Sequence, residues 1–174
     1  MPAPDAPAIE HLSWTPWLRL AFAALAAAVL AVAFRPWQHV PLHPISEDAY
    51  YSLAVARNVA QGRGITIDGS TWTNGFQPLF TMLCVPIYWI TGDPIRGVRL
   101  VHLLQGAIMV ASALLFGRLA SRNAPARDEE TRRDLAWLAS LSWLGSLQLL
   151  QHSLNGLETP LMLLLIMACW WVVQ

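Results

Sequence analysis

The chain contains no lysine, so all eleven of its basic residues are arginines. Only 13% of its 174 residues are charged, and its formal net charge is zero. The arginines are scattered, apart from five that share one segment with four acids, so nothing indicates a nucleic-acid partner. Its two cysteines, Cys84 and Cys169, lie inside apolar runs without metal-ligand spacing or a secreted disulfide context. We interpret both as packing residues.

Apolar residues, in contrast, are abundant. They make up 55% of the chain, which has nine tryptophans and a mean hydropathy of +0.42. This composition is far more apolar than that of an ordinary soluble domain and predicts an integral membrane protein. The apolar residues form five segments, with no apparent internal repeat, at residues 17–34, 76–90, 98–119, 135–151 and 161–173.

The second of these segments is too short to cross a bilayer. A helix over 76–90 would reach about 22 Å, whereas the hydrocarbon core is about 30 Å thick. It also contains Pro86, which removes a backbone hydrogen bond that lipid cannot replace. We therefore expect a kinked juxtamembrane or re-entrant helix here. The fold predicted for 1–174 is a single all-α, polytopic membrane domain with spans at 17–34, 98–119, 135–151 and 159–174.

The arginine-rich segment sets the expected orientation. Short loops rich in arginine tend to stay in the cytoplasm, which places 120–134 inside. Residues 35–97, with amphipathic juxtamembrane helices, and residues 152–158 then face outward. We predict a multi-pass protein of the cell (inner) membrane. Because Ala31-Val32-Ala33 resembles a signal-peptidase site, a cleaved first segment remains an alternative to an uncleaved first helix. The last apolar run barely suffices to span, so we expect the N-terminal portion of a larger protein.

The outward-facing segment opens with two adjacent acids, Glu47 and Asp48. Ser46 is a good N-cap, so both acids fall in a first helical turn, where the helix dipole favours negative charge. Gly62 and Gly64 then end the helix. Helical spacing predicts a polar side with Glu47, Tyr50, Arg57, Asn58 and Gln61, and an apolar side with Tyr51, Leu53, Val55, Ala56, Val59 and Ala60. Asp48 falls on the apolar side, where a capping acid has no need to be. Whether Glu47 and Asp48 only stabilise the start of the helix or also have a functional role stays open.

Further candidate residues lie on the same predicted side of the membrane. Asn74 belongs to the second of two turn signals, Asp68-Gly69 and Asn74-Gly75, in ITIDGSTWTNGFQPLF, a stretch that is also typical of a surface loop. Asn155 and Glu158 lie in HSLNGLET at the boundary of a membrane helix, where an acid is often only solvated. Arg99 and His102, one turn apart, suit a phosphate group, although interfacial snorkelling also explains Arg99.

The order of these motifs resembles a known superfamily. The sequence is similar to the N-terminal module of GT-C membrane glycosyltransferases in the order of six features. These are an apolar first helix, E-D-A-Y-Y, A-R-N-V-A-Q-G-R-G, T-N-G-F-Q-P-L, an arginine-rich turn and N-G-L-E-T. That superfamily includes protein O-mannosyltransferases, aminoarabinose transferases of lipid A, oligosaccharyltransferase catalytic subunits and mycobacterial arabinofuranosyltransferases. The last group looks nearest. The resemblance covers about 17–173.

The resemblance implies a transferase that uses a polyprenyl-phosphate sugar on the extracytoplasmic face. The first outer acidic pair of the superfamily matches Glu47 and Asp48, which become the expected catalytic residues. The second outer acidic motif of the superfamily matches Glu158. Many relatives begin the pair with Asp, so the division of roles between Glu47 and Asp48 stays open. Expected substrate-binding residues are Tyr50, Asn74, Arg99, His102, Asn155 and Glu158.

No cofactor is required by this expectation, although some relatives hold a divalent metal, for which Asp48 and Glu158 are the candidates. Expected partners are the lipid bilayer, the lipid-linked sugar donor and a glycan, lipid or protein acceptor. Relatives usually continue through many more membrane helices and often a soluble domain, so this chain alone is expected to lack activity. The alternative from another class is a non-enzymatic membrane assembly subunit or carrier component.

Overall fold

The computed structural model describes residues 14–42, 44–125 and 128–173, and its regular structure in these ranges is helical. A single isolated bridge joins Thr66 and Trp72. The predicted all-α class is therefore confirmed. The helices are α1 Thr15–Ala31, α2 Glu47–Ala60, α3 Pro78–Thr91, α4 Pro94–Asn123, α5 Glu129–Leu144, α6 Leu147–Ser153 and α7 Thr159–Val173, with short 3₁₀ turns η1 Val32–Phe34 and η2 Trp37–His39.

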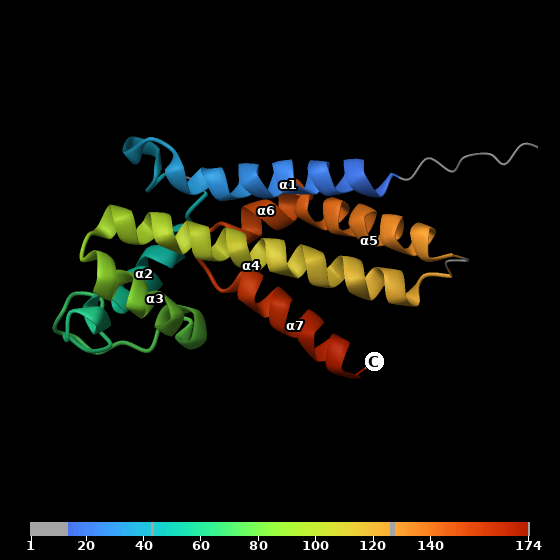
Figure 1. Ribbon diagram of the computed structural model, residues 1–174. Coiled ribbons are helices and arrows are strands. Elements are labelled where there is room, and N and C mark those ends of the chain that lie inside the picture. Colours follow the sequence, from blue (N-terminus) through green and yellow to red (C-terminus); the bar gives the residue numbers. More distant parts are fainter. Residues whose placement is uncertain (1–13, 43, 126–127, 174) are drawn as a thin grey trace, which may run out of the picture.

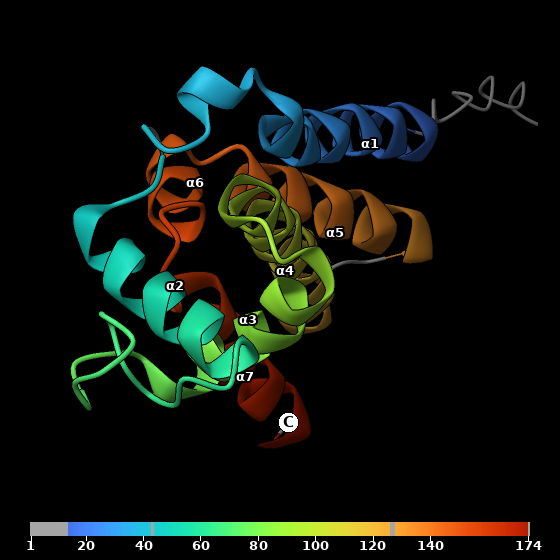
Figure 2. The same cartoon turned by 90° about the vertical axis from the view of Figure 1, so that its left-hand side faces the viewer.

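Three helices, α1, α4 and α5, lie side by side, with α1 and α5 running in one direction and α4 in the other (Figure 1). The start of α1 and the α4–α5 connection share one end of this bundle, where the Thr15 hydroxyl donates a hydrogen bond to Asp134. The opposite end, which we call the α2 end, carries α2, α3 and the start of α4 (Figure 2). Helix α7 starts beside the middle of α4 and diverges from it (Figure 1). The segments 35–97 and 152–158 thus meet at the α2 end.

Within the part of the chain that the structure describes, two helices are long and apolar enough to cross a membrane. They are α1 with η1, at Thr15–Phe34, and α4, whose 30 residues extend about 45 Å. Only 17% of the apolar window of the first helix is buried inside the protein. Contiguous exposed apolar surface of this kind is rare on soluble monomers. Helices α3 and α7 are apolar but shorter, with 14 and 15 residues.

The predicted third span does not form one helix. The chain over 135–151 is divided between α5, which begins earlier at Glu129, and the short helix α6. The break lies at Gly145, whose N–H closes α5 by donating to the Leu141 carbonyl at 2.8 Å. Ser146 then starts α6, because its hydroxyl accepts from the Leu149 N–H at 3.4 Å. A new N-cap directly after glycine is the physical reason for the break.

The two sides of α2 also differ from the expected pattern. Leu53 and Val55 are buried as predicted, but Tyr51 is 52% exposed and Asn58 is buried. The connection after α2 folds back over the helix, so the Asn58 side-chain amide donates to the carbonyls of Thr66 and Ile67, each at 2.9 Å. An asparagine that satisfies two carbonyls is stable in a buried place, and helical spacing alone does not reveal those partners.

Candidate functional site at the α2 end

The start of α2 is joined to the connection between α6 and α7. The Ser46 N–H donates to the Asn155 carbonyl at 2.9 Å, and the Ser46 hydroxyl donates to the same oxygen at 3.3 Å. Ser46 holds the N-cap position as predicted, but its side chain makes no capping bond to α2. The hydroxyl instead links two segments that are 109 residues apart. We call this contact the Ser46–Asn155 junction.

A close backbone approach fixes the junction. Gly156 has φ +86°, and a Cβ atom built on it would lie 2.6 Å from the Cβ of Ala49 on α2. Only glycine suits a position with both this conformation and this contact. The fully buried Gln105 of α4 holds the same connection, donating to the Leu157 carbonyl at 2.8 Å and accepting from the Gly156 N–H at 3.2 Å. Helices α2 and α4 thus clamp residues 155–158 from two sides.

Glu47 and Asp48 lie in the first turn of α2, as predicted, and both are exposed. Neither makes a hydrogen bond or ion pair with a residue that the structure describes. On the side of α2 where the sequence pattern places Asp48, Val55 is buried whereas Tyr51 is exposed. The ranking of Asp48 above Glu47 stays a prediction.

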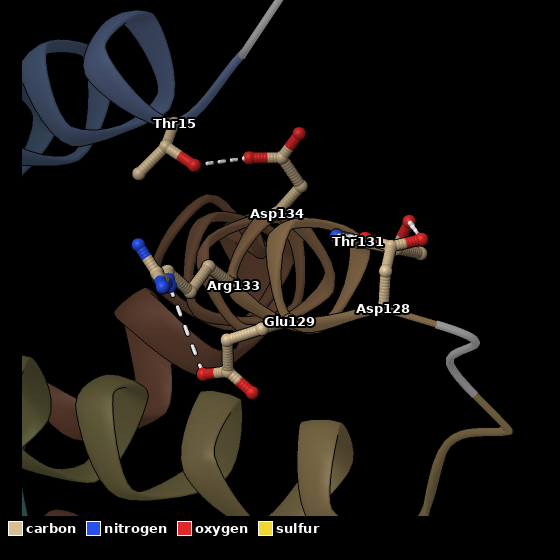
Figure 3. Close-up of polar contacts among 6 residues, drawn as sticks. All are labelled: Thr15, Asp128, Glu129, Thr131, Arg133 and Asp134. Carbon is tan, nitrogen blue, oxygen red and sulfur yellow. Dashed lines mark hydrogen bonds and ion pairs between the residues drawn. The ribbon is translucent and has the colours of Figure 1, made fainter. Parts of the chain in front are cut away.

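Three acids at the other end of the bundle, Asp128, Glu129 and Asp134, have partners (Figure 3). Asp128 caps α5 by accepting from the Thr131 N–H at 2.7 Å, and Glu129 lies 3.7 Å from Arg133. Asp134 accepts from the Thr15 hydroxyl that joins α5 to α1. These contacts serve the helices themselves. Glu47 and Asp48 have no comparable partner among the residues that the structure describes, and both are exposed, so both carboxylates are accessible to a ligand.

Glu158 follows the junction and directly precedes α7. It is half-buried, and its Oε2 atom is buried without a hydrogen-bond partner. This side chain lines a cavity of about 640 Å³ between the N-terminal residues of α3 and one side of α7. We call this cavity the Glu158 groove. Asn155, in contrast, uses its side chain to hold the backbone, because Oδ1 accepts from the Leu157 N–H at 3.1 Å.

Arginines gather on the other side of the junction, around Arg35. Its guanidinium donates to the Val40 carbonyl at 2.7 Å, and the Arg99 guanidinium donates to the Arg35 carbonyl at 3.2 Å. The Tyr50 hydroxyl donates to the Pro41 carbonyl. Burial raises the pKa of this hydroxyl, and the charge of the nearby Arg35 lowers it. The structure thus brings two predicted residues, Tyr50 and Arg99, to an arginine that we did not predict.

Arg35 also lines a second cavity, of about 420 Å³, with residues of α1 and α6. Its Nε atom is buried without a partner, and burial lowers the pKa of the guanidinium while the nearby Tyr50 raises it. We call this cavity the Arg35 cavity. Pro44 and Leu154, close in sequence to the two residues of the junction, line it as well. The only signal in the sequence was the position of Arg35 directly after the first apolar run.

The remaining predicted residues are placed differently. His102 is buried on α4, and its ring nitrogens lie near the Val98 and Leu154 carbonyls without reaching hydrogen-bond geometry. It lies within electrostatic range of Arg35. Asn74 is exposed in the connection between α2 and α3 and lines neither cavity. The structure therefore brings His102, but not Asn74, to the junction region.

A dedicated metal site does not fit the residues that the structure describes. Among them, no group of three or more His, Cys, Asp or Glu side chains could hold an ion. The pair predicted for a metal, Asp48 and Glu158, has too few ligands for a protein-held divalent ion, and no step is assigned to one. No family model, curated protein or solved structure matches the chain.

Proposed function

We propose that the chain is the membrane module of a GT-C-like glycosyltransferase, which moves a sugar from a polyprenyl-phosphate donor to an extracytoplasmic acceptor. The observation that supports it most is the Ser46–Asn155 junction. The resemblance matches two outer acidic motifs, one with Glu47 and Asp48 and one with Glu158, and the junction joins the segments that carry them.

We further propose four membrane crossings, by α1, α4, the α5–α6 pair and α7. The cytoplasmic side would carry the arginine-rich connection and the start of α1, and the cell (inner) membrane would hold the module. This arrangement is supported by the common location of the start of α1 and the α4–α5 connection at one end of the bundle (Figure 1). It puts the α2 end, with Glu47 and Asp48, outside.

The reaction needs a base and a stabilised leaving group. An acceptor hydroxyl attacks the anomeric carbon, the bond from that carbon to the phosphate oxygen breaks, and its electron pair leaves with the polyprenyl phosphate. Glu47 or Asp48 takes the hydroxyl proton. Arg35 and Arg99 stabilise the phosphate, because guanidinium groups match its geometry and charge. The same carboxylate also orients the hydroxyl for attack by accepting its hydrogen bond.

Neutral variants of the acids test this proposal. In membranes containing the chain within its full reading frame, Asp48→Asn or Glu47→Gln should retain donor binding, and at least one should lose acceptor-dependent transfer by about 100-fold. Glu130→Gln is the matched control, because Glu130 is an exposed acid in the first turn of α5 at the far end. If transfer stayed normal in both test variants, the acids would only stabilise the helix, and a non-enzymatic membrane component would be the better description.

A further inference from the structure

The Glu158 groove has one polar end and a long apolar wall. Along α7, the residues that line it are Glu158, Leu161, Met162, Leu165, Ile166 and Cys169. Their spacing of three and four residues places them on one side of the helix. Residues 76–80 at the start of α3 form the facing wall. The only ionisable oxygen-bearing group among these residues is the carboxyl of Glu158, and it lies at one end of the row.

The length of this row matches one lipid chain. Eleven helical steps separate Glu158 from Cys169, which corresponds to about 16 Å. One leaflet contributes half of a hydrocarbon core about 30 Å thick, or roughly 15 Å. A chain that belongs to a single leaflet would therefore fill the groove from end to end. Leu165 and Ile166 are 45% and 56% exposed, so the wall is open to such a chain.

The polar end selects the head group. Oε2 of Glu158 is buried without a hydrogen-bond donor, so burying it leaves an unsatisfied acceptor. A ligand hydroxyl would donate to it, whereas a phosphate would meet like charge. The Arg35 cavity has the opposite character, with a buried N–H that lacks an acceptor. The two cavities on either side of the junction thus favour ligands of different charge.

We propose that the acceptor is a lipid with a free hydroxyl, whose chain lies in the Glu158 groove and whose hydroxyl donates to Glu158. This inference rests on the proposed transferase function and adds the class of acceptor. The phosphate of the donor belongs on the Arg35 side. The groove then holds the hydroxyl at the junction, from the leaflet in which the donor also resides. For transfer, the hydroxyl exchanges its hydrogen bond to Glu158 for one to Glu47 or Asp48, which takes the proton.

Photolabelling tests the inference. The full chain in nanodiscs is exposed to diacylglycerol with a diazirine in one acyl chain, or to phosphatidic acid with the same chain. We expect the diacylglycerol to label the α7 peptide about tenfold more than the phosphatidic acid. Leu165→Trp should reduce that labelling about tenfold by filling the groove. The control Leu138→Trp changes a leucine of similar exposure, 51% against 45%, on α5 and should have no effect.

Glu158→Leu tests the head-group contact separately from the groove. This variant should remove the preference for diacylglycerol while Leu165→Trp still blocks both probes. Equal labelling by the two probes in the unmodified chain would overturn the inference. So would labelling that survives Leu165→Trp, or crosslinks from a diazirine placed at Leu165 to a second protein copy in place of lipid.

The transfer assay distinguishes the two proposals. If the chain transferred sugar to a water-soluble acceptor and Leu165→Trp left that rate unchanged, the acceptor inference would fail and the proposed function would stand. If no acceptor supported transfer, the proposed function would fail, and with it the assignment of the bound lipid as acceptor.

Discussion

Replacing Gly156 by alanine probes the junction most sharply. At φ +86°, a residue with a Cβ atom pays a conformational penalty of about 1–2 kcal/mol. The new methyl group would also lie 2.6 Å from the Cβ of Ala49, which is closer than real contacts allow. Overpacking of this kind costs about 1–3 kcal/mol, so the free energy of unfolding should fall by roughly 2–5 kcal/mol.

Gly62→Ala separates these two effects. Gly62 has φ +75°, but a Cβ atom there would meet nothing within 4 Å. It therefore carries the conformational penalty alone, and the difference between the two variants measures the contact between α2 and the 155–158 connection. The assay is denaturant unfolding of the purified chain in detergent micelles, followed by tryptophan fluorescence.

A second change should partly rescue the first. In Gly156→Ala, the additional Ala49→Gly substitution removes the opposing methyl group, so the double variant should recover about 1–3 kcal/mol relative to the sum of the single effects. Gly156→Ala would refute the junction if it cost no more than Gly62→Ala. Strictly additive effects of Gly156→Ala and Ala49→Gly would refute it equally.

Three other features give testable expectations. Single cysteines replacing Asn74 and Arg132, in a background without native cysteines, should be labelled from opposite sides of the membrane; labelling of both from outside contradicts the four-span proposal. Arg35→Gln should weaken donor binding about tenfold in equilibrium titrations, since it removes charged hydrogen bonds to phosphate, whereas a variant that binds normally removes Arg35 from the site. Hydrogen bonds from the Thr71 backbone, the Ser70 backbone and the Thr71 hydroxyl lower the pKa of Asp68. These hydrogen bonds contribute their full stabilisation of the loop above the ordinary Asp pKa, and the contribution disappears as the pH falls through the lowered pKa of Asp68. The NMR shift of the Thr71 amide should therefore stay unchanged down to about pH 4. A titration midpoint of that shift at or above about pH 4 contradicts the lowered pKa of Asp68.

Local signals were sufficient for the elements whose ends depend on nearby residues. Helix α2 starts after Ser46 and ends before the glycines at positive φ, Gly62 and Gly64, because N-cap position and backbone freedom are local properties. The all-α class followed equally well from long apolar runs. The break at Gly145 was missed because hydrophobic content is continuous there, whereas the break depends on one glycine and one capping serine.

Long-range contacts limited the prediction of the site. The motifs around Glu47 and Glu158 were found, but nothing in their local pattern shows that Ser46 donates to Asn155. The same limit explains Arg35, whose role as the centre of the basic group depends on how the chain turns back at Val40. Tyr51 and Asn58 were assigned to the wrong sides of α2, because the connection that covers Asn58 comes from outside the helix.

The most direct test of the central claim, that the two acidic segments serve one transfer site, is the transfer rate of the Asp48→Asn, Glu158→Gln double variant compared with the two single variants. Groups that act together in one site have non-additive effects. The proposal predicts that the double variant loses little more than the more damaged single variant. Losses that multiply as for independent sites, or a normal rate in Glu158→Gln, would contradict it.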